Sequence, residues 1–372
     1  MIWTLPTPGL YPVHRTAHAC TEFSGYSLAQ ALTRGGLPCT CTQAAAGPQV
    51  DRYTFAVCDI YKISRLRSLL PALETLTGCT VRRAALAPAG AFVLEISRRN
   101  RNPVYFGDCI SNAAWLTSST PAALVGVGAA GQITALNVDR APHVLIAGQT
   151  GAGKSVLMSS IICSLLFKNG PDTSRFIFID PKLCEFAQYK SLPHVKKGDF
   201  IASAPAALQT LQTLCTEMDT RYTRMTKTGQ RQTSEAPTYI FIDELADLMM
   251  TAGPAKKQME SAIVRLAQKG RAAGYHLIIA TQSPRTSVIT GLIAANIPVK
   301  VALTVSSARE SCIILGHGGA EKLTGRGDCI LKTPLAGEMR LQAPFISDQE
   351  IALTVQHWTR QTGPCWLKWL FK

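Results

Sequence analysis

The chain has 372 residues, a formal net charge of +14, 47% hydrophobic residues and 17% charged residues. These proportions exclude a disordered chain, and the length predicts two domains with a large core. The basic excess favours a polyanionic partner, without separating DNA from RNA or from an acidic membrane surface. The longest apolar run, around residues 156–167, is too short to cross a bilayer, and the first residues lack a signal-peptide pattern. We therefore expect a cytoplasmic protein.

Residues 1–100 predict a small α/β domain behind an N-terminal extension. Helices are expected over residues 26–36 and 61–78, and strands over residues 51–58, 80–88 and 91–97. The run RRNRNP at residues 98–103 has the composition of a linker to the next domain.

The twelve cysteines are scattered and form no C-x-x-C pair. Only Cys39 and Cys41 are closely spaced, with His14, His18 and Cys20 upstream. A zinc site there is the less favoured interpretation, because ordinary thiols in a reducing compartment explain the same pattern.

A glycine-rich turn joins two apolar runs within HVLIAGQTGAGKSVLMSSIICSLLF, residues 143–167. The first run predicts a short buried strand and the second a buried helix. Between them, residues 148–155 fit G-x-x-x-x-G-K-[ST], in which backbone N–H groups cradle phosphates, the lysine reaches the β- and γ-phosphates, and the hydroxyl ligates Mg²⁺. The predicted ATP-binding residues are Gly148, Gln149, Thr150, Gly151, Ala152, Gly153, Lys154, Ser155 and Val156.

Strand-like and helix-like segments alternate after this turn. Strands are expected over residues 175–180, 238–245, 275–282, 299–305 and 328–332, and helices over residues 203–229 and 253–274. Such alternation predicts a mostly parallel sheet covered by helices, in a domain spanning residues 101–346. Residues 347–372 remain as a C-terminal helix or tail.

Two acids lie near the end of the strand pattern TYIFIDEL, at the sheet edge where ligands of such folds bind. Asp243 is the expected partner of Mg²⁺, together with Ser155, and Glu244 is the expected base for an attacking water. The alternative is that both acids only cap the next helix. Gln282, at the end of the following strand, is a candidate sensor of the γ-phosphate.

Three basic residues precede that strand on one helix. A cation supplied by a neighbouring subunit accelerates phosphoryl transfer, but spacing does not choose among Arg265, Lys269 and Arg271. A solvated basic face is the alternative.

Several blocks in order resemble the motor region of FtsK/SpoIIIE-type DNA translocases, from about residue 20 to residue 356. They are GPQVDRYTF, RNPVYFGDCI, IDPKLCEF, EMDTRYTRM, FIDELADLMM, RLAQKGRAAGYHLIIATQSP, VITGLIAANIP and GRGDCIL.

The resemblance implies a RecA-like P-loop ATPase that forms a hexameric ring and moves double-stranded DNA with ATP and Mg²⁺. It implies that Arg271 is the arginine acting in trans, with Arg265 as the fallback, and that Gln282 is the sensor. It places Arg285, Lys300 and Arg309 near the DNA pore.

The chain departs from the family pattern where DNA contacts are expected. Ser283 replaces an arginine, and Ala294, Ala308 and Cys312 stand where basic residues are usual. Arg285 and Arg309 are candidates to replace those charges from nearby positions.

The absence of recognisable anchor and DNA-reading segments suggests a phage, plasmid or other mobile-element role, with such functions on a separate partner protein. Two alternatives stay open: a protein-export motor of the same fold, and a DNA-binding assembly factor switched by ATP. The alternating aromatic and basic residues of the tail CWLKWLFK are a further candidate contact.

Overall fold

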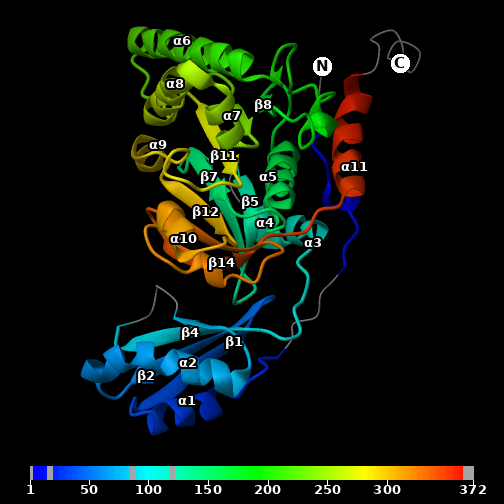
Figure 1. Ribbon diagram of the computed structural model, residues 1–372. Coiled ribbons are helices and arrows are strands. Elements are labelled where there is room, and N and C mark those ends of the chain that lie inside the picture. The colour runs from blue at the N-terminus through cyan, green and yellow to red at the C-terminus, as the bar shows by residue number, and fades with distance from the viewer. Residues whose placement is uncertain (1–2, 15–19, 84–88, 118–121, 139, 363–372) are drawn as a thin grey trace.

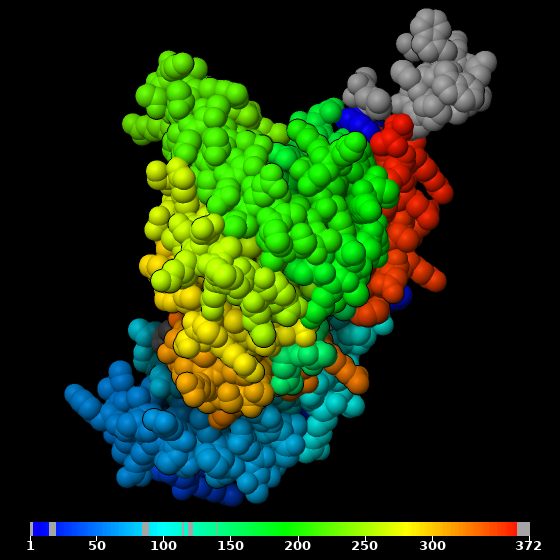
Figure 2. Space-filling model, turned by 45° about the horizontal axis from the view of Figure 1, so that its top comes forward, coloured from blue at the N-terminus to red at the C-terminus, as the bar shows by residue number. Residues whose placement is uncertain are grey.

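The computed structural model describes residues 3–14, 20–83, 89–117, 122–138 and 140–362, and the CWLKWLFK tail lies outside them. The described residues form a small unit and a larger one (Figure 1). In Figures 1 and 2 the small unit lies beside the orange part of the chain, which contains α10 and β14.

The small unit is an antiparallel sheet covered by two helices. Its strands lie in the order β1-β2-β4-β3, with β1 Cys39–Ala46, β2 Val50–Val57, β3 Val81–Arg83 and β4 Ala91–Ser97. Helices α1 Gly25–Arg34 and α2 Leu66–Thr77 enclose a core that includes Tyr53, Phe55 and Phe92.

Strand β1 was not predicted, and it contains the closely spaced Cys39 and Cys41. Among the described residues, no group of His, Cys, Asp and Glu side chains is arranged to hold a metal ion. His18 lies outside those residues. The structure therefore gives the zinc interpretation no support in the part of the chain that it describes.

The larger unit is built on a ten-stranded sheet in the order β6-β5-β14-β13-β12-β7-β11-β10-β8-β9. Its strands are β5 Ala122–Gly128, β6 Ile133–Asn137, β7 His143–Ala147, β8 Arg175–Ile179, β9 Phe200–Ile201, β10 Thr238–Ile242, β11 Tyr275–Thr281, β12 Val299–Leu303, β13 Asp328–Thr333 and β14 Gly337–Gln342. The run from β12 to β9 is parallel, as predicted.

The other end of this sheet is antiparallel, which the βα alternation did not predict. Strand β13 pairs antiparallel with β12, and β14, β5 and β6 continue in the same manner. The β13–β14 connection is a short turn without a helix, and such turns join only antiparallel neighbours.

Helices cover both faces of the sheet, so its central strands are apolar on both sides. Val144 and Ile146 of β7 belong to one core cluster, and Leu145 and Ala147 belong to the other. The first face carries α3 Phe106–Ile110, α4 Ala113–Leu116, α5 Lys154–Lys168 and α11 Asp348–Thr359. The second carries α6 Ala204–Thr228, α7 Leu245–Thr251, α8 Lys256–Lys269, α9 Gly291–Asn296 and α10 Ala308–Leu315.

Helix boundaries follow local capping. The Ser203 side chain accepts from Ala206 N at the start of α6, and left-handed Gly229 ends that helix. The predicted helix over 253–274 is shorter, since a 3₁₀ turn precedes α8. The 3₁₀ segments are η1 Pro8–Leu10, η2 Ile60–Arg65, η3 Ala187–Tyr189, η4 Gly253–Ala255, η5 Ala320–Lys322 and η6 Arg360–Thr362.

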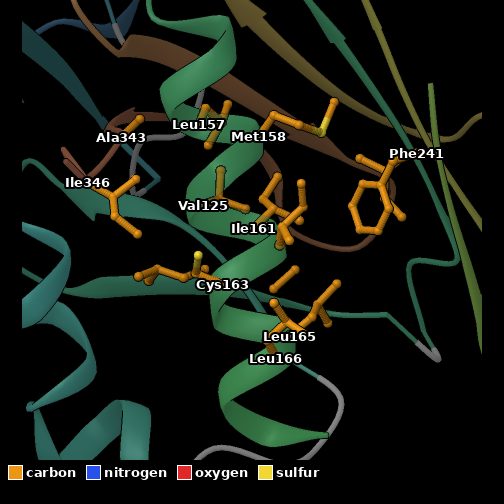
Figure 3. Close-up of a cluster of buried hydrophobic side chains, with 14 of the residues drawn as sticks. Val125, Leu157, Met158, Ile161, Cys163, Leu165, Leu166, Phe241, Ala343 and Ile346 are labelled. Atoms are coloured by element: carbon orange, nitrogen blue, oxygen red, sulfur yellow. The ribbon is translucent and has the colours of Figure 1, made fainter. Parts of the chain in front are cut away.

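Helix α5, which follows the predicted phosphate loop, is buried almost all round. Ile161, Leu165 and Leu166 point from it into the core beside Val125 and Phe241 (Figure 3). Its Ser164 hydroxyl accepts a hydrogen bond of 2.9 Å from Leu124 N on β5. A helix that is apolar all round is stable only when enclosed in this way.

The expected linker is fastened to the small unit. Arg98 is buried and its guanidinium lies 2.7 Å from the Asp51 carboxylate, while the Arg99 and Asn100 N–H groups donate to Glu22. Before the small unit, Tyr11 packs into the core of the larger unit. Among the described residues, no helix has the length and apolar character needed to cross a membrane.

Candidate nucleotide site

The phosphate loop connects the carboxyl end of β7 to the first turn of α5. Gly151 and Gly153 have φ values of 79° and 103°, which side chains rarely adopt. The loop is fixed from outside, because Gln149 N donates to Thr304 O at 2.9 Å and Gly327 N donates to Ala152 O at 2.8 Å. The first N–H groups of α5 have no acceptor within the helix, so this end is suited to an anion.

Lys154 and Asp243 form a buried pair at the centre of the site. Lys154 Nζ lies 2.6 Å from Asp243 Oδ1 and 3.0 Å from Asp243 O, and each residue is only 4% exposed. The predicted phosphate-binding lysine and the predicted metal partner are thus in direct contact. Because a buried charge needs compensation, each one supplies the counter-charge for the other.

Ser155 is held by an acid that sequence reasoning did not single out. Its hydroxyl donates to Glu185 Oε1 at 2.8 Å. Glu185 follows β8, which lies next to β10 in the sheet, so both strands bring acids to the same edge. The sequence signal that could have identified Glu185 is its position within the block IDPKLCEF, which begins at the end of a predicted strand. The hydroxyl and carboxylate oxygens of Ser155, Asp243 and Glu185 are the donor types that suit Mg²⁺.

Glu244 is buried at the start of α7. One carboxylate oxygen accepts from Thr281 Oγ1 at 2.6 Å and from Ala246 N at 3.2 Å, and the other accepts from Gln282 N at 2.8 Å. Glu244 therefore does cap the next helix, which was the alternative for this acid. It also contacts the strand end that carries Gln282.

Gln282 reaches the phosphate loop directly. Its Oε1 accepts a 2.8 Å hydrogen bond from the Thr150 hydroxyl. The structure therefore brings Thr150, Lys154, Ser155, Asp243, Glu244 and Gln282 together at one sheet edge. A polar chain thus runs from the phosphate loop to the end of β11.

A cavity of about 470 Å³ lies beside the loop and was not predicted. Gly151, Gly153 and Val156 line it from the loop side, and Val104 and Phe345 give it an apolar wall. Its lining also includes the left-handed Arg326, with φ of 51°, and Gln49 of the small unit. A concave site of this size with an apolar wall and a few polar groups has the character of a small-molecule pocket.

Arg271 does not join this group. It is exposed between α8 and β11, at the amino end of β11, beside a polar cavity of about 250 Å³. Strand β11 is parallel to β7, so its seven residues put about 20 Å between Arg271 and the edge that holds the phosphate loop. Arg265 is exposed and pairs with Asp219 at 2.5 Å, and the exposed Lys269 accepts through its carbonyl from Tyr222 Oη.

The three residues predicted near DNA do not lie together. Arg285 and Arg309 are exposed just beyond the carboxyl ends of β11 and β12. Lys300 is at the amino end of β12 and only partly exposed. Burial, and secondly the nearby Lys332, lower the pKa of Lys300.

Comparison with known proteins gives one family match. The FtsK/SpoIIIE family model matches residues 109–240 and 225–286. Among the similar curated proteins, the DNA translocase FtsK of Vibrio vulnificus is 35% identical over 358 residues, covering 86% of this chain and 36% of the relative. The DNA translocase SftA of Bacillus subtilis is 37% identical over 339 residues, covering 86% and 35%. The chain thus spans about a third of the length of these relatives.

A solved structure shares the fold. It is the pCW3 conjugation coupling protein TcpA in its monomer form with ATPγS. The TM-score is 0.62 at 22% identity, and the match covers 88% of this chain and 96% of TcpA. The resemblance found from sequence motifs is confirmed, as is the α/β fold of a P-loop ATPase with a large, mostly parallel sheet.

Proposed function

The chain carries a domain of the FtsK/SpoIIIE family, and on that premise we propose that it is an ATP-hydrolysing motor that moves double-stranded DNA. The single observation that carries the proposal is the phosphate loop with Lys154 and Asp243 at one sheet edge, directly connected to Gln282. The two similar curated proteins are both DNA translocases, which supports DNA as the substrate.

In this proposal the triphosphate lies on residues 148–155, and the adjacent cavity holds the base and ribose. Lys154 exchanges Asp243 for the phosphate oxygens, which frees the Asp243 carboxylate. Ser155 and Asp243 would then hold Mg²⁺, which would supply positive charge against the phosphates.

Glu244 would orient the attacking water and accept its proton. Both of its oxygens are engaged by donors, so one hydrogen bond has to be exchanged for a bond to water. Gln282 senses the γ-phosphate in this scheme, because its amide already contacts Thr150 of the loop. Arg285 follows only three residues later, which gives a short path from nucleotide state to DNA contact.

The position of Arg271 supports assembly into a ring. Arg271 lies at the opposite end of the sheet from its own phosphate loop, so a role for it in hydrolysis would have to be at the nucleotide of another subunit. A homo-oligomer, hexameric as the family resemblance suggests, would place it there. The mobile-element setting, the separate partner protein and the cytoplasmic location stay predictions.

Duplex binding at increasing salt tests the choice of substrate. Phosphate contacts release counterions, so the association constant for a random duplex should fall steeply and linearly on a log–log plot against salt. Replacing both Arg285 and Arg309 by alanine removes about two phosphate contacts, so the slope should become shallower by about two. Salt-independent or undetectable duplex binding would instead favour the protein-export motor.

A further inference from the structure

A third carboxylate reaches the nucleotide site from the segment that follows β8. Ser155 Oγ donates to Glu185 Oε1 at 2.8 Å, while Asp243, the acid after β10, is engaged by Lys154. The hydroxyl expected to ligate Mg²⁺ is therefore already oriented by an acid other than the expected metal partner.

The segment 180–186 is built to deliver this carboxylate. Asp180 is fully buried, and its oxygens accept from the N–H groups of Lys182 at 3.2 Å, Glu185 at 3.0 Å and Phe186 at 3.0 Å. Leu183 between them has a φ of 57°, and a non-glycine residue keeps such a conformation only where its surroundings impose it. Three N–H groups of the segment thus converge on one buried side chain.

Contacts on both sides hold the segment in place. Phe186 is 1% exposed and its ring lies 5.0 Å from that of Phe178 on β8. Lys182 Nζ lies 2.8 Å from Asp247 on α7, at the same sheet edge. Glu185 therefore approaches Ser155 from a fixed backbone.

We propose that Glu185 positions the Ser155 hydroxyl for Mg²⁺, an inference that rests on the proposed nucleotide function. A hydroxyl has one hydrogen to donate and two lone pairs. With its hydrogen on Glu185, the oxygen directs its lone pairs away from that carboxylate, where a cation can be bound. Partners of this kind orient ligands and raise their basicity, and losing one costs about 10–100-fold in metal affinity or activity.

The test is a Mg²⁺ titration of the full chain with a fluorescent, non-hydrolysable ATP analogue. Glu185→Ala should raise the half-saturating Mg²⁺ concentration about tenfold or more, while analogue affinity in EDTA stays at the wild-type value. Glu185→Gln keeps the shape and an acceptor oxygen, so its shift should be smaller. Glu260→Gln changes a carboxylate on α8 whose hydrogen-bond partner is Thr290, away from the segment 180–186, and it should follow the wild-type curve.

The outcomes separate this inference from the proposed function. A wild-type Mg²⁺ curve in both Glu185 variants overturns the inference alone, as does an equal shift in Glu260→Gln. A loss of affinity in EDTA as large as that in Mg²⁺ means a structural role and also overturns it. Failure of the wild-type chain to bind the analogue at all refutes the nucleotide site itself.

Discussion

Gly153 should be the least replaceable glycine of the phosphate loop. A Cβ there would lie 2.7 Å from Gly327 N and 3.1 Å from Gly327 Cα, in addition to the strain of a φ of 103°. Gly151 has a φ of 79° but no atom within 4 Å of such a Cβ, and Gly291, at the start of α9, has neither problem. Alanine at these three positions therefore distinguishes the effect of the steric clash, present only at Gly153, from that of the strained backbone, present at Gly151 and Gly153.

The expected costs follow from these distances. Gly291→Ala should change the free energy of unfolding by less than about 0.5 kcal/mol. Gly151→Ala should cost about 1–2 kcal/mol for the strained backbone alone. Gly153→Ala adds overpacking against the backbone of residue 327 and should cost about 2–5 kcal/mol.

Urea unfolding and titration with a fluorescent ATP analogue measure both consequences. Gly153→Ala should also weaken analogue binding most, since relief of the clash separates the loop from residue 327. Equal stability and equal affinity in Gly151→Ala and Gly153→Ala would refute the idea that this contact holds the loop.

Three further predictions concern pH, assembly and DNA. Burial, and secondly His276, lower the pKa of His143 to about 3, and burial lowers that of His276 to about 4, so both stay neutral in the folded state. The unfolded chain takes up these protons below about pH 6.5, whereas the folded chain does not. The free energy of unfolding should therefore decrease as the pH is lowered, by roughly 2 kcal/mol per histidine at about pH 5, which urea titrations at several pH values would measure. Arg271→Ala should bind the ATP analogue normally yet lose about 10³-fold or more in ATP turnover, and normal turnover would contradict a role in trans. In duplex-binding assays Arg285→Ala should lower affinity, whereas Lys300→Ala, on the far end of β12, should leave it unchanged.

The parts of the site predictable from sequence are those made by neighbouring residues. Strand β7, the glycine turn and α5 follow one another in the chain, so one motif specified both the loop and its setting. Asp243 and Glu244 were found for the same reason, since a buried strand directly precedes them.

Contacts between distant segments were not predictable. The hydrogen bond between Ser155 and Glu185 and the packing of Gly153 on Gly327 depend on how strands are ordered in the sheet. The antiparallel strands beyond β12 were missed because the βα alternation carries no information about an edge formed by hairpins. Lys300 was grouped with Arg285 from sequence likeness alone. The two residues lie at opposite edges of the sheet, because Lys300 is near the start of β12 and Arg285 follows the end of the parallel strand β11.

The most direct test of the account is the ATPase rate with and without long duplex DNA, for the wild-type chain and for Glu244→Gln. We expect duplex DNA to stimulate the wild type strongly, and the variant to lose about 10²–10⁴-fold in rate while still binding ATP. An ATPase rate that is the same with and without duplex DNA, in a chain that still assembles into rings, would contradict the proposal of a DNA motor.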